Sequence, residues 1–134
     1  MQMDVGVDLV SVGRVQASLA RFGDRFLRRI FTESEIAYAT SAPELAAERL
    51  AARFAAKEAA IKALGLVDQG IGWRQIEVER LASGQCRLVL HADARAAADR
   101  AGVGGLSVSL THEGEYSAAV VVAVRNDDQR KASQ

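Results

Sequence analysis

One long helical segment constrains the fold more than any other feature of this sequence. The stretch RFAAKEAAIKALG, Arg53–Gly65, is built largely from Ala, Leu, Ile, Lys and Glu, which favour helices. We expect this helix to run to about Leu64 and to end at Gly65. At about 100° per residue, its apolar positions form one stripe, which includes Lys57 and has Glu58 at its edge. Two charges in these places need a structural or a functional explanation.

Shorter segments on both sides of this helix predict strands and smaller helices. Strands are expected at 5–12, 74–81, 86–91, 106–112 and 116–124, and the last four form two hairpins. Shorter helices are expected at 14–23 and at 92–102, and capping boxes at 32–35 and 41–44 predict two further helix starts. This order predicts an α+β fold, in which a mostly antiparallel sheet packs against one long central helix with shorter helices beside it. We expect a single domain over residues 1–125 and a polar C-terminal tail over 126–134.

Composition and charge are those of an ordinary soluble protein. The chain has 134 residues, enough for one domain with a core, and 49% of them are hydrophobic. The formal net charge is zero, so no overall field attracts nucleic acid or a membrane surface. The single cysteine, Cys86, excludes an internal disulfide framework and agrees with a reducing compartment. Since neither a signal peptide nor a membrane-spanning run is evident, we expect a cytoplasmic protein without nucleic-acid or membrane partners.

Three polar residues stand where apolar ones are expected. Asp8 lies inside the first strand, Glu58 at the edge of the helix stripe, and His112 at the end of a strand on its apolar face. Each has an ordinary explanation: a strand-end acid, a solvated acid and a satisfied core histidine. Together, two carboxylates with a lysine nearby can hold a hard cation against phosphate. Mg²⁺ is such a cation, because it binds through one or two carboxylates, several waters and substrate phosphates.

Basic residues also recur along one edge of the long helix. Arg49, Arg53 and Lys57 follow one another at i, i+4 and i+8, and like charges at this spacing cost about a few tenths of a kcal/mol per pair. Such a ridge has either acids nearby or an anion to bind. The alternative is an ordinary ion pair between Glu58 and Lys62, with the stem of Lys57 buried and its ammonium in water.

Three segments in order resemble the holo-(acyl carrier protein) synthases, the small class of 4′-phosphopantetheinyl transferases. They are GVDLVSVGR at Gly6–Arg14, RFAAKEAAIKALG at Arg53–Gly65 and SLTHEGEYSAAVVV at Ser109–Val122, and FTESE at Phe31–Glu35 is similar as well. The resemblance implies the fold of that family. It also implies an enzyme that transfers the 4′-phosphopantetheine arm of coenzyme A to a serine of an apo acyl carrier protein and releases adenosine 3′,5′-bisphosphate.

The same resemblance implies roles for individual residues. Asp8 and Glu58 correspond to the Mg²⁺ ligands, and Lys62 completes the catalytic set at the phosphates. Arg53 and His112 correspond to residues near the adenosine and its 3′-phosphate. The base that activates the serine stays open, with Glu58 as the candidate, acting directly or through a metal-bound water. Contacts to coenzyme A are implied for Arg53, Lys57, Lys62, Thr111 and His112.

Two kinds of protein partner are expected. Residues 11–30 carry five arginines against one acid, and acyl carrier proteins are generally acidic. We therefore expect the carrier to bind through Arg14, Arg21 and Arg25. The run YSAAVVVAV, Tyr116–Val124, is apolar on both strand faces apart from Ser117, so its second face needs cover from the long helix of the same subunit or from another subunit. The resemblance implies a homotrimer with coenzyme A sites between subunits.

Two other functions would use the same residues. A Mg²⁺-dependent nucleotide phosphohydrolase would use the two carboxylates with water as the nucleophile. A non-catalytic module would bind coenzyme A or a carrier protein without turnover. The fate of coenzyme A and the mass of an apo carrier protein after incubation with Mg²⁺ distinguish these functions from arm transfer.

Overall fold

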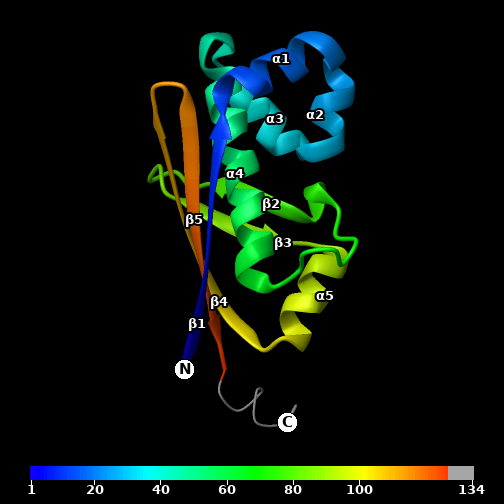
Figure 1. Ribbon diagram of the computed structural model, residues 1–134, viewed down its shortest axis with the longest axis vertical. Helices are drawn as coiled ribbons and strands as arrows, with labels where there is room; N and C mark the ends of the chain where they lie inside the picture. The colour runs from blue at the N-terminus through cyan, green and yellow to red at the C-terminus, as the bar shows by residue number, and fades with distance from the viewer. Residues whose placement is uncertain (127–134) are drawn as a thin grey trace.

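The computed structural model describes residues 1–126, which Figure 1 shows as two sheets arranged around one long helix. The order of elements is the one that the sequence predicts. The strands are β1 (Gln2–Ser11), β2 (Ile76–Arg80), β3 (Cys86–Leu90), β4 (Val103–Glu113) and β5 (Tyr116–Arg125). The helices are α1 (Val12–Phe22), α2 (Asp24–Ile30), α3 (Glu33–Thr40), α4 (Ala46–Leu64) and α5 (Ala92–Arg100), with short 3-10 turns at Pro43–Leu45 and Trp73–Gln75.

Helix α4 is the centre of the fold because it packs on two sides. One side lies on the sheet of β1, β5 and β4, and the other contacts α1, α3 and β2. Alanine supplies most of the buried positions of α4, so neighbouring backbones can approach closely. The closest approach is at Gly6 of β1, where a Cβ atom would lie 2.0 Å from the carbonyl oxygen of Ala59. The helix ends as predicted at Gly65, which has a φ of 69°.

The larger sheet has the order β1–β5–β4, and β5 pairs antiparallel with both neighbours. Strand β1 begins at Gln2, earlier than predicted, because Gln2 continues the ladder opposite Arg125. Strands β2 and β3 form a separate two-stranded antiparallel sheet. The predicted α+β class with a long central helix is confirmed, and the structure adds that the antiparallel strands are divided between two sheets.

The two faces of the larger sheet have different surroundings. Ala119 and Val121 of β5 are buried on the side that packs against α4. Because side chains alternate along a strand, their neighbours point to the opposite face. There Val7 is 61% exposed, Leu9 63% and Val120 37%. Helix α4 therefore covers one face only, and within a single chain the other face is apolar and open to solvent.

One of the two predicted capping boxes forms. At the start of α3, the amide of Thr32 donates to the Glu35 carboxylate at 2.8 Å and the Glu35 amide donates to the Thr32 hydroxyl at 3.3 Å. The prediction of a second capping box, at 41–44, is wrong. Ser41 follows the end of α3 and its hydroxyl donates to the carbonyl oxygen of Tyr38 at 2.7 Å, while the turn at Pro43 has no side-chain cap.

Two further expectations concern the whole chain. Among the described residues, no helix has both the length and the apolar character needed to cross a membrane. Of the polar tail expected at 126–134, all but Asn126 lies outside the described residues. The domain bounds at 1–125 stay a prediction.

Candidate active site

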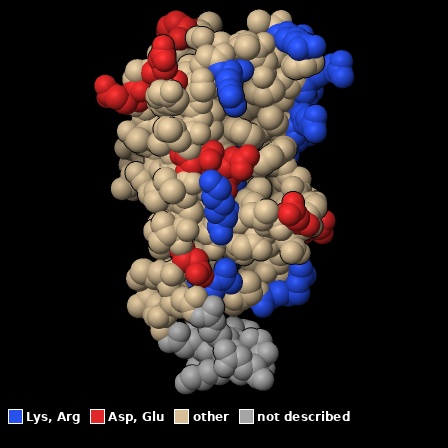
Figure 2. Space-filling model, in the orientation of Figure 1, with Lys and Arg blue, Asp and Glu red and all other residues tan. Residues whose placement is uncertain are grey.

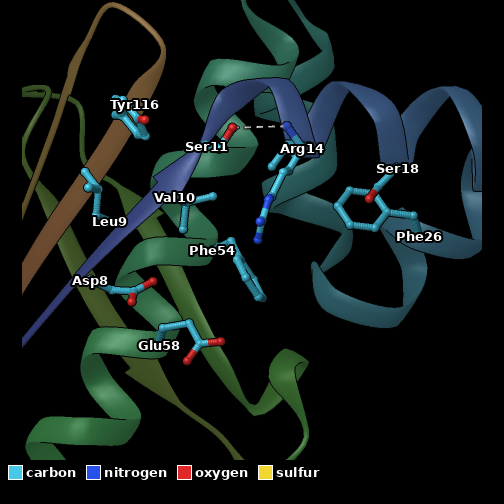
Figure 3. A pocket seen from close by; sticks show the side chains of 11 residues that line it. Asp8, Leu9, Val10, Ser11, Arg14, Ser18, Phe26, Phe54, Glu58 and Tyr116 are labelled. Atoms are coloured by element: carbon cyan, nitrogen blue, oxygen red, sulfur yellow. Dashed lines mark hydrogen bonds between the residues drawn. The ribbon is translucent and has the colours of Figure 1, made fainter.

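Asp8, Glu58 and Lys62 come together where β1 crosses α4. The Lys62 ammonium lies 3.2 Å from Oδ1 of Asp8 and donates to the carbonyl oxygen of Val7 at 3.0 Å. Among the ion pairs of the described residues, Lys62 thus pairs with Asp8 and not, as the sequence also allowed, with Glu58. Figure 3 shows the carboxylates of Asp8 and Glu58 beside each other, one from each element. Their meeting depends on Gly6, because only a glycine admits the α4 backbone so close to β1.

The electrostatics of this cluster favour a bound cation. Burial raises the pKa of Glu58, the nearby Asp8 raises it further, and Lys62 opposes both effects. A cation between the two carboxylates would relieve their repulsion. Within the described part of the chain, no three His, Cys, Asp or Glu side chains form a metal-binding group. The two carboxylates of Asp8 and Glu58 fit Mg²⁺, which takes one or two carboxylates from the protein and completes its shell with waters and substrate phosphates.

A cavity of about 710 Å³ opens beside the two carboxylates. Figure 3 shows Asp8 and Glu58 at one end, Phe54 as an apolar wall and Arg14 reaching in from the start of α1. Arg14 is positioned by the helix cap, since its amide donates to the Ser11 hydroxyl at 3.3 Å. An acidic end that can hold a metal, followed by an apolar wall, suits a phosphorylated ligand with a long uncharged arm.

Arg53, Thr111 and His112 lie in a different place from the carboxylate cluster. They line a second cavity, of about 360 Å³, which shares no lining residue with the first. In it, Nδ1 of His112 lies 3.1 Å from Oε1 of Glu48. Residues that the resemblance assigns to one bound coenzyme A are therefore divided into two sets within a single chain.

Lys57 lines neither of these two cavities, and its contact with coenzyme A stays a prediction. Its side chain is fully buried, and its ammonium lies 2.8 Å from Oε1 of Glu35. It also donates to the carbonyl oxygens of Trp73, at 3.1 Å, and Ile76. Burial lowers the pKa of Lys57, whereas Glu35 raises it. The alternative with the ammonium in water is excluded for the same reason, because the charge is neutralised inside the core.

Arginine side chains cover the outer surface of α1 and α2. Arg14, Arg21 and Arg25 are all exposed, and Asp24 is the only acid in these two helices. Figure 2 shows basic side chains along the edge of the molecule where α1 and α2 lie. Phe22, beside Arg21, is 45% exposed. This surface, positive with an apolar residue in it, is suited to an acidic protein partner.

Two contributors to these sites were missed at the level of sequence. Glu35 was recognised only as a helix cap, and its capping pattern gives no sign that its carboxylate also neutralises Lys57, 22 residues away. Arg80 lines the second cavity with Arg53 because the β2–β3 hairpin carries it there. Alternation along the strand indicates a polar position at Arg80, but no sequence pattern indicates what it faces.

Comparison with known proteins identifies the family of this chain. Residues 4–121 match the model of the 4′-phosphopantetheinyl transferase superfamily. The chain belongs to this family. The holo-[acyl-carrier-protein] synthase of Gloeobacter violaceus is 42% identical to it over 120 residues, covering 90% of this chain and 91% of that protein. The enzyme of the same name from Solidesulfovibrio magneticus is 44% identical over 119 residues, covering 88% of this chain and 94% of that protein.

Solved structures of this family share the fold. The Chronobacterium ammoniagenes ACPS–CoA complex matches with a TM-score of 0.81 at 29% identity, covering 94% of this chain and 99% of that one. The Helicobacter pylori holo-[acyl-carrier-protein] synthase in complex with coenzyme A gives 0.78 at 27% identity, covering 90% and 99%. The predicted fold and the predicted resemblance to the holo-(acyl carrier protein) synthases are both confirmed.

Proposed function

We propose that this protein transfers the 4′-phosphopantetheine arm of coenzyme A to a serine of an apo acyl carrier protein and releases adenosine 3′,5′-bisphosphate. The observation that carries the proposal is the meeting of Asp8, Glu58 and Lys62, with the two carboxylates at one end of a cavity of about 710 Å³. Family membership supplies the reaction class, the names of the relatives supply the carrier protein, and the solved structures in complex with coenzyme A supply the donor. The arginine-rich surface of α1 and α2 favours this function over a nucleotide phosphohydrolase, which needs no protein substrate.

Asp8 and Glu58 are the residues that would hold Mg²⁺, and Lys62 supports them. When bound, the ion offsets the charge of the diphosphate and the charge that develops on its oxygens during transfer. The Lys62 side chain is 48% exposed next to Asp8, so its ammonium is available to a phosphate oxygen. Metal binding can be measured without turnover, by titrating Mg²⁺ into the wild type and into Asp8→Asn in the absence of coenzyme A.

The transfer forms a bond between the carrier serine oxygen and the β-phosphorus of coenzyme A and breaks the bond to the bridging oxygen. The serine hydroxyl has to lose its proton, since the neutral hydroxyl is a weak nucleophile. Glu58 accepts this proton, directly or through a water.

The basic surface of α1 and α2 binds the carrier protein in this proposal. Arg14 lies at both places, since it is exposed on α1 and also reaches the cavity with Asp8 and Glu58. Charge reversal by Arg14→Glu should raise the KM for carrier protein far more than the KM for coenzyme A, and added salt should weaken the wild-type interaction. Equal effects on both KM values would reject carrier docking on this surface.

We also propose that the protein acts as a homotrimer with sites shared between subunits. Two observations support a shared site. The apolar face of the larger sheet, with Val7, Leu9 and Val120, is open in a single chain. In addition, the carboxylate cluster and the set of Arg53, Thr111 and His112 line separate cavities. Closed symmetry would cover the face and could bring one set from each of two neighbouring subunits to the same ligand.

One assay tests the function against its alternatives. The protein is incubated with coenzyme A, Mg²⁺ and an apo acyl carrier protein, and the carrier is weighed by mass spectrometry. Transfer adds the mass of the phosphopantetheine arm to the wild-type reaction, and Asp8→Asn should lose it. Breakdown of coenzyme A in the absence of carrier would indicate a phosphohydrolase. Binding of coenzyme A or carrier without any turnover would indicate a non-catalytic binding module. A carrier variant with alanine at the modified serine is the matched control.

We propose a cytoplasmic location, with no nucleic-acid or membrane partner. The free Cys86 agrees with a reducing compartment, and the zero net charge gives no general attraction to anionic polymers or lipid surfaces. Fractionation of cells that express the protein, with carrier modification as the marker activity, tests the location.

A further inference from the structure

A third cavity, of about 290 Å³, adjoins the first one beside Phe54. The two cavities share three lining residues, Ser18, Phe26 and Phe54. Figure 3 shows Ser18 and Phe26 across the first cavity from Asp8, so the third cavity adjoins the end that lies away from the carboxylates. A ligand that enters the first cavity at the carboxylates can therefore extend into the third. The other lining residues of the third cavity are Phe22, Arg25, Arg29, Ile30 and Trp73.

Aromatic and aliphatic side chains form the inner part of the third cavity. The rings of Phe54 and Trp73 pack against each other, with their centroids 5.1 Å apart and their planes at 57°. Ile30 of α2 adds buried apolar surface. The two charged lining residues, Arg25 and Arg29, are exposed, so their charge lies on the solvent side. The inner part of this cavity therefore suits an uncharged, apolar group.

The position of Trp73 is fixed from inside the core. The Lys57 ammonium donates to the carbonyl oxygen of Trp73 at 3.1 Å, and the Glu35 carboxylate holds the same ammonium at 2.8 Å. Both charged side chains are buried, so this anchor is shielded from solvent. Because Trp73 lines the third cavity and not the first, its indole is a fixed wall at the part of the path that lies beyond Phe54.

We propose that the third cavity takes an acyl group carried on the thiol of the donor, and that Trp73 limits the length of this group. The inference rests on the proposed function, in which Asp8 and Glu58 hold the diphosphate. From the diphosphate to the thiol, the arm is roughly 15 Å long, about the length of four to five extended residues. Phe54 is one helical turn from Glu58, about 6 Å along α4. The arm is therefore long enough to pass Phe54 and to bring its thiol end to the third cavity.

An acylated donor would react by the same steps as coenzyme A. The carrier serine oxygen bonds to the β-phosphorus, the bridging oxygen leaves with adenosine 3′,5′-bisphosphate, and the serine proton passes to the base. The thioester is not touched, so the carrier receives an arm that is already acylated.

The size of the third cavity sets the expected length of the acyl chain. A volume of about 290 Å³ has room for about nine or ten groups of roughly 30 Å³, the share of a water molecule in the liquid. We therefore expect acyl chains of up to about eight carbons to fit. Each methylene that the cavity buries should tighten binding by up to about fourfold.

Trp73 is the only tryptophan in the sequence, so its fluorescence reports binding in the third cavity directly. The protein with Mg²⁺ and without carrier is titrated with adenosine 3′,5′-bisphosphate, with coenzyme A, and with the butyryl, octanoyl and dodecanoyl thioesters of coenzyme A. The bisphosphate lacks the arm and should leave the emission unchanged. The octanoyl thioester should bind at least about tenfold more tightly than coenzyme A, and the dodecanoyl thioester no more tightly than the octanoyl one.

Variants of Trp73 test whether its indole sets the length limit. Trp73→Ala widens the cavity, so the dodecanoyl thioester should now bind more tightly than the octanoyl one. Calorimetry measures this, because the variant has no tryptophan. Trp73→Phe should shift the order less, since a ring remains. The matched control is Arg74→Gln, an exposed neighbour that lines none of the three cavities and should keep the wild-type order.

The possible results separate the acyl site from the transferase function. A wild type that binds the octanoyl thioester no more tightly than coenzyme A overturns the acyl site, whatever the variants do. A folded Trp73→Ala protein with the wild-type order overturns the role of Trp73. If that variant instead raises the KM for carrier, the cavity takes a carrier side chain and the proposal is rejected. The expected order of binding without any transfer keeps the acyl site and rejects the proposed function, and transfer without that order does the reverse.

Discussion

Glu58 lies where its ionised form is disfavoured, by burial first and by Asp8 second. A carboxyl group whose pKa is raised by folding destabilises the folded state once it is ionised. This cost is present above the folded-state pKa and is absent below the unfolded-state pKa, where the group is protonated in both states. A cation held between Glu58 and Asp8 would offset the cost, so the position is costly to the free protein and useful to the substrate complex.

The first prediction separates these two effects at Glu58. We expect Glu58→Gln to lower the transfer rate by at least about 100-fold, because it removes a metal ligand and a base together. Without metal, the same variant should unfold at a slightly higher temperature than the wild type at pH 7, and this gain should vanish near pH 4, about the ordinary pKa of glutamate. Thermal unfolding at both pH values checks this. A metal-free variant that is less stable at pH 7 would contradict the assigned repulsion.

Lys57 and Glu35 give the second prediction, which concerns stability. Both are almost completely buried, and Glu35 also accepts a hydrogen bond from the amide of Val78 at 2.8 Å. Lys57→Met leaves a buried carboxylate without its cation, which should cost about 3–5 kcal/mol of the free energy of unfolding. Adding Glu35→Gln should recover part of this loss, because it removes the unpaired charge. Denaturant unfolding measures the stability of the single and the double variant. A Lys57→Met protein with wild-type stability but weakened coenzyme A binding would instead support the assignment of Lys57 to coenzyme A binding.

At the scale of secondary structure, the contact between β1 and α4 sets the geometry of the carboxylate cluster. Gly6→Ala would place a methyl group 2.0 Å from the carbonyl oxygen of Ala59, so one element has to move. We expect a loss of about 1–3 kcal/mol in the free energy of unfolding, as for an overpacked core, together with a lower transfer rate.

The control for this third prediction is Gly13→Ala, in α1, where the nearest atom is the Ser11 hydroxyl at 3.7 Å. That substitution should be neutral or slightly stabilising, because alanine favours a helix more than glycine does. A Gly6→Ala protein with normal stability and normal transfer would show that the close approach of the two elements has no role in the site.

Local sequence patterns predicted the order of the helices and strands, whereas the partners of individual polar side chains depend on tertiary contacts that the patterns do not contain. The apolar stripe and Gly65 defined α4, and alternation placed Asp8 on the strand face that carries Gly6. The same stripe placed Lys57 on the apolar side of α4, but its buried ion pair with Glu35 was not predictable, because periodicity places a residue on a face without naming its partner. The meeting of Asp8 with Glu58 was supported only by family resemblance, since it depends on how a strand and a helix cross.

For the whole molecule, the fourth prediction concerns assembly. Light scattering should give a mass near three times the 14.3 kDa of one chain. Val120→Asp places a charge on the open apolar face of the larger sheet, so it should lower both the mass and the transfer rate. Ala96→Asp, at an exposed position of α5, should change neither. A Val120→Asp monomer with full activity would reject the shared site.

The division of the ligand contacts between two cavities also predicts the activity of mixed oligomers that contain two different inactive variants. A variant that lacks Asp8 keeps an intact second cavity, and one that lacks Arg53 keeps intact carboxylates. Separately, both should be inactive. We assume that each site combines the carboxylates of one subunit with the second cavity of its neighbour, and that subunits exchange at random. An equal mixture of the two variants should then recover about a quarter of the wild-type rate, because one subunit interface in four joins intact carboxylates to an intact second cavity. In a cell, two loss-of-function alleles of this one gene would then complement each other.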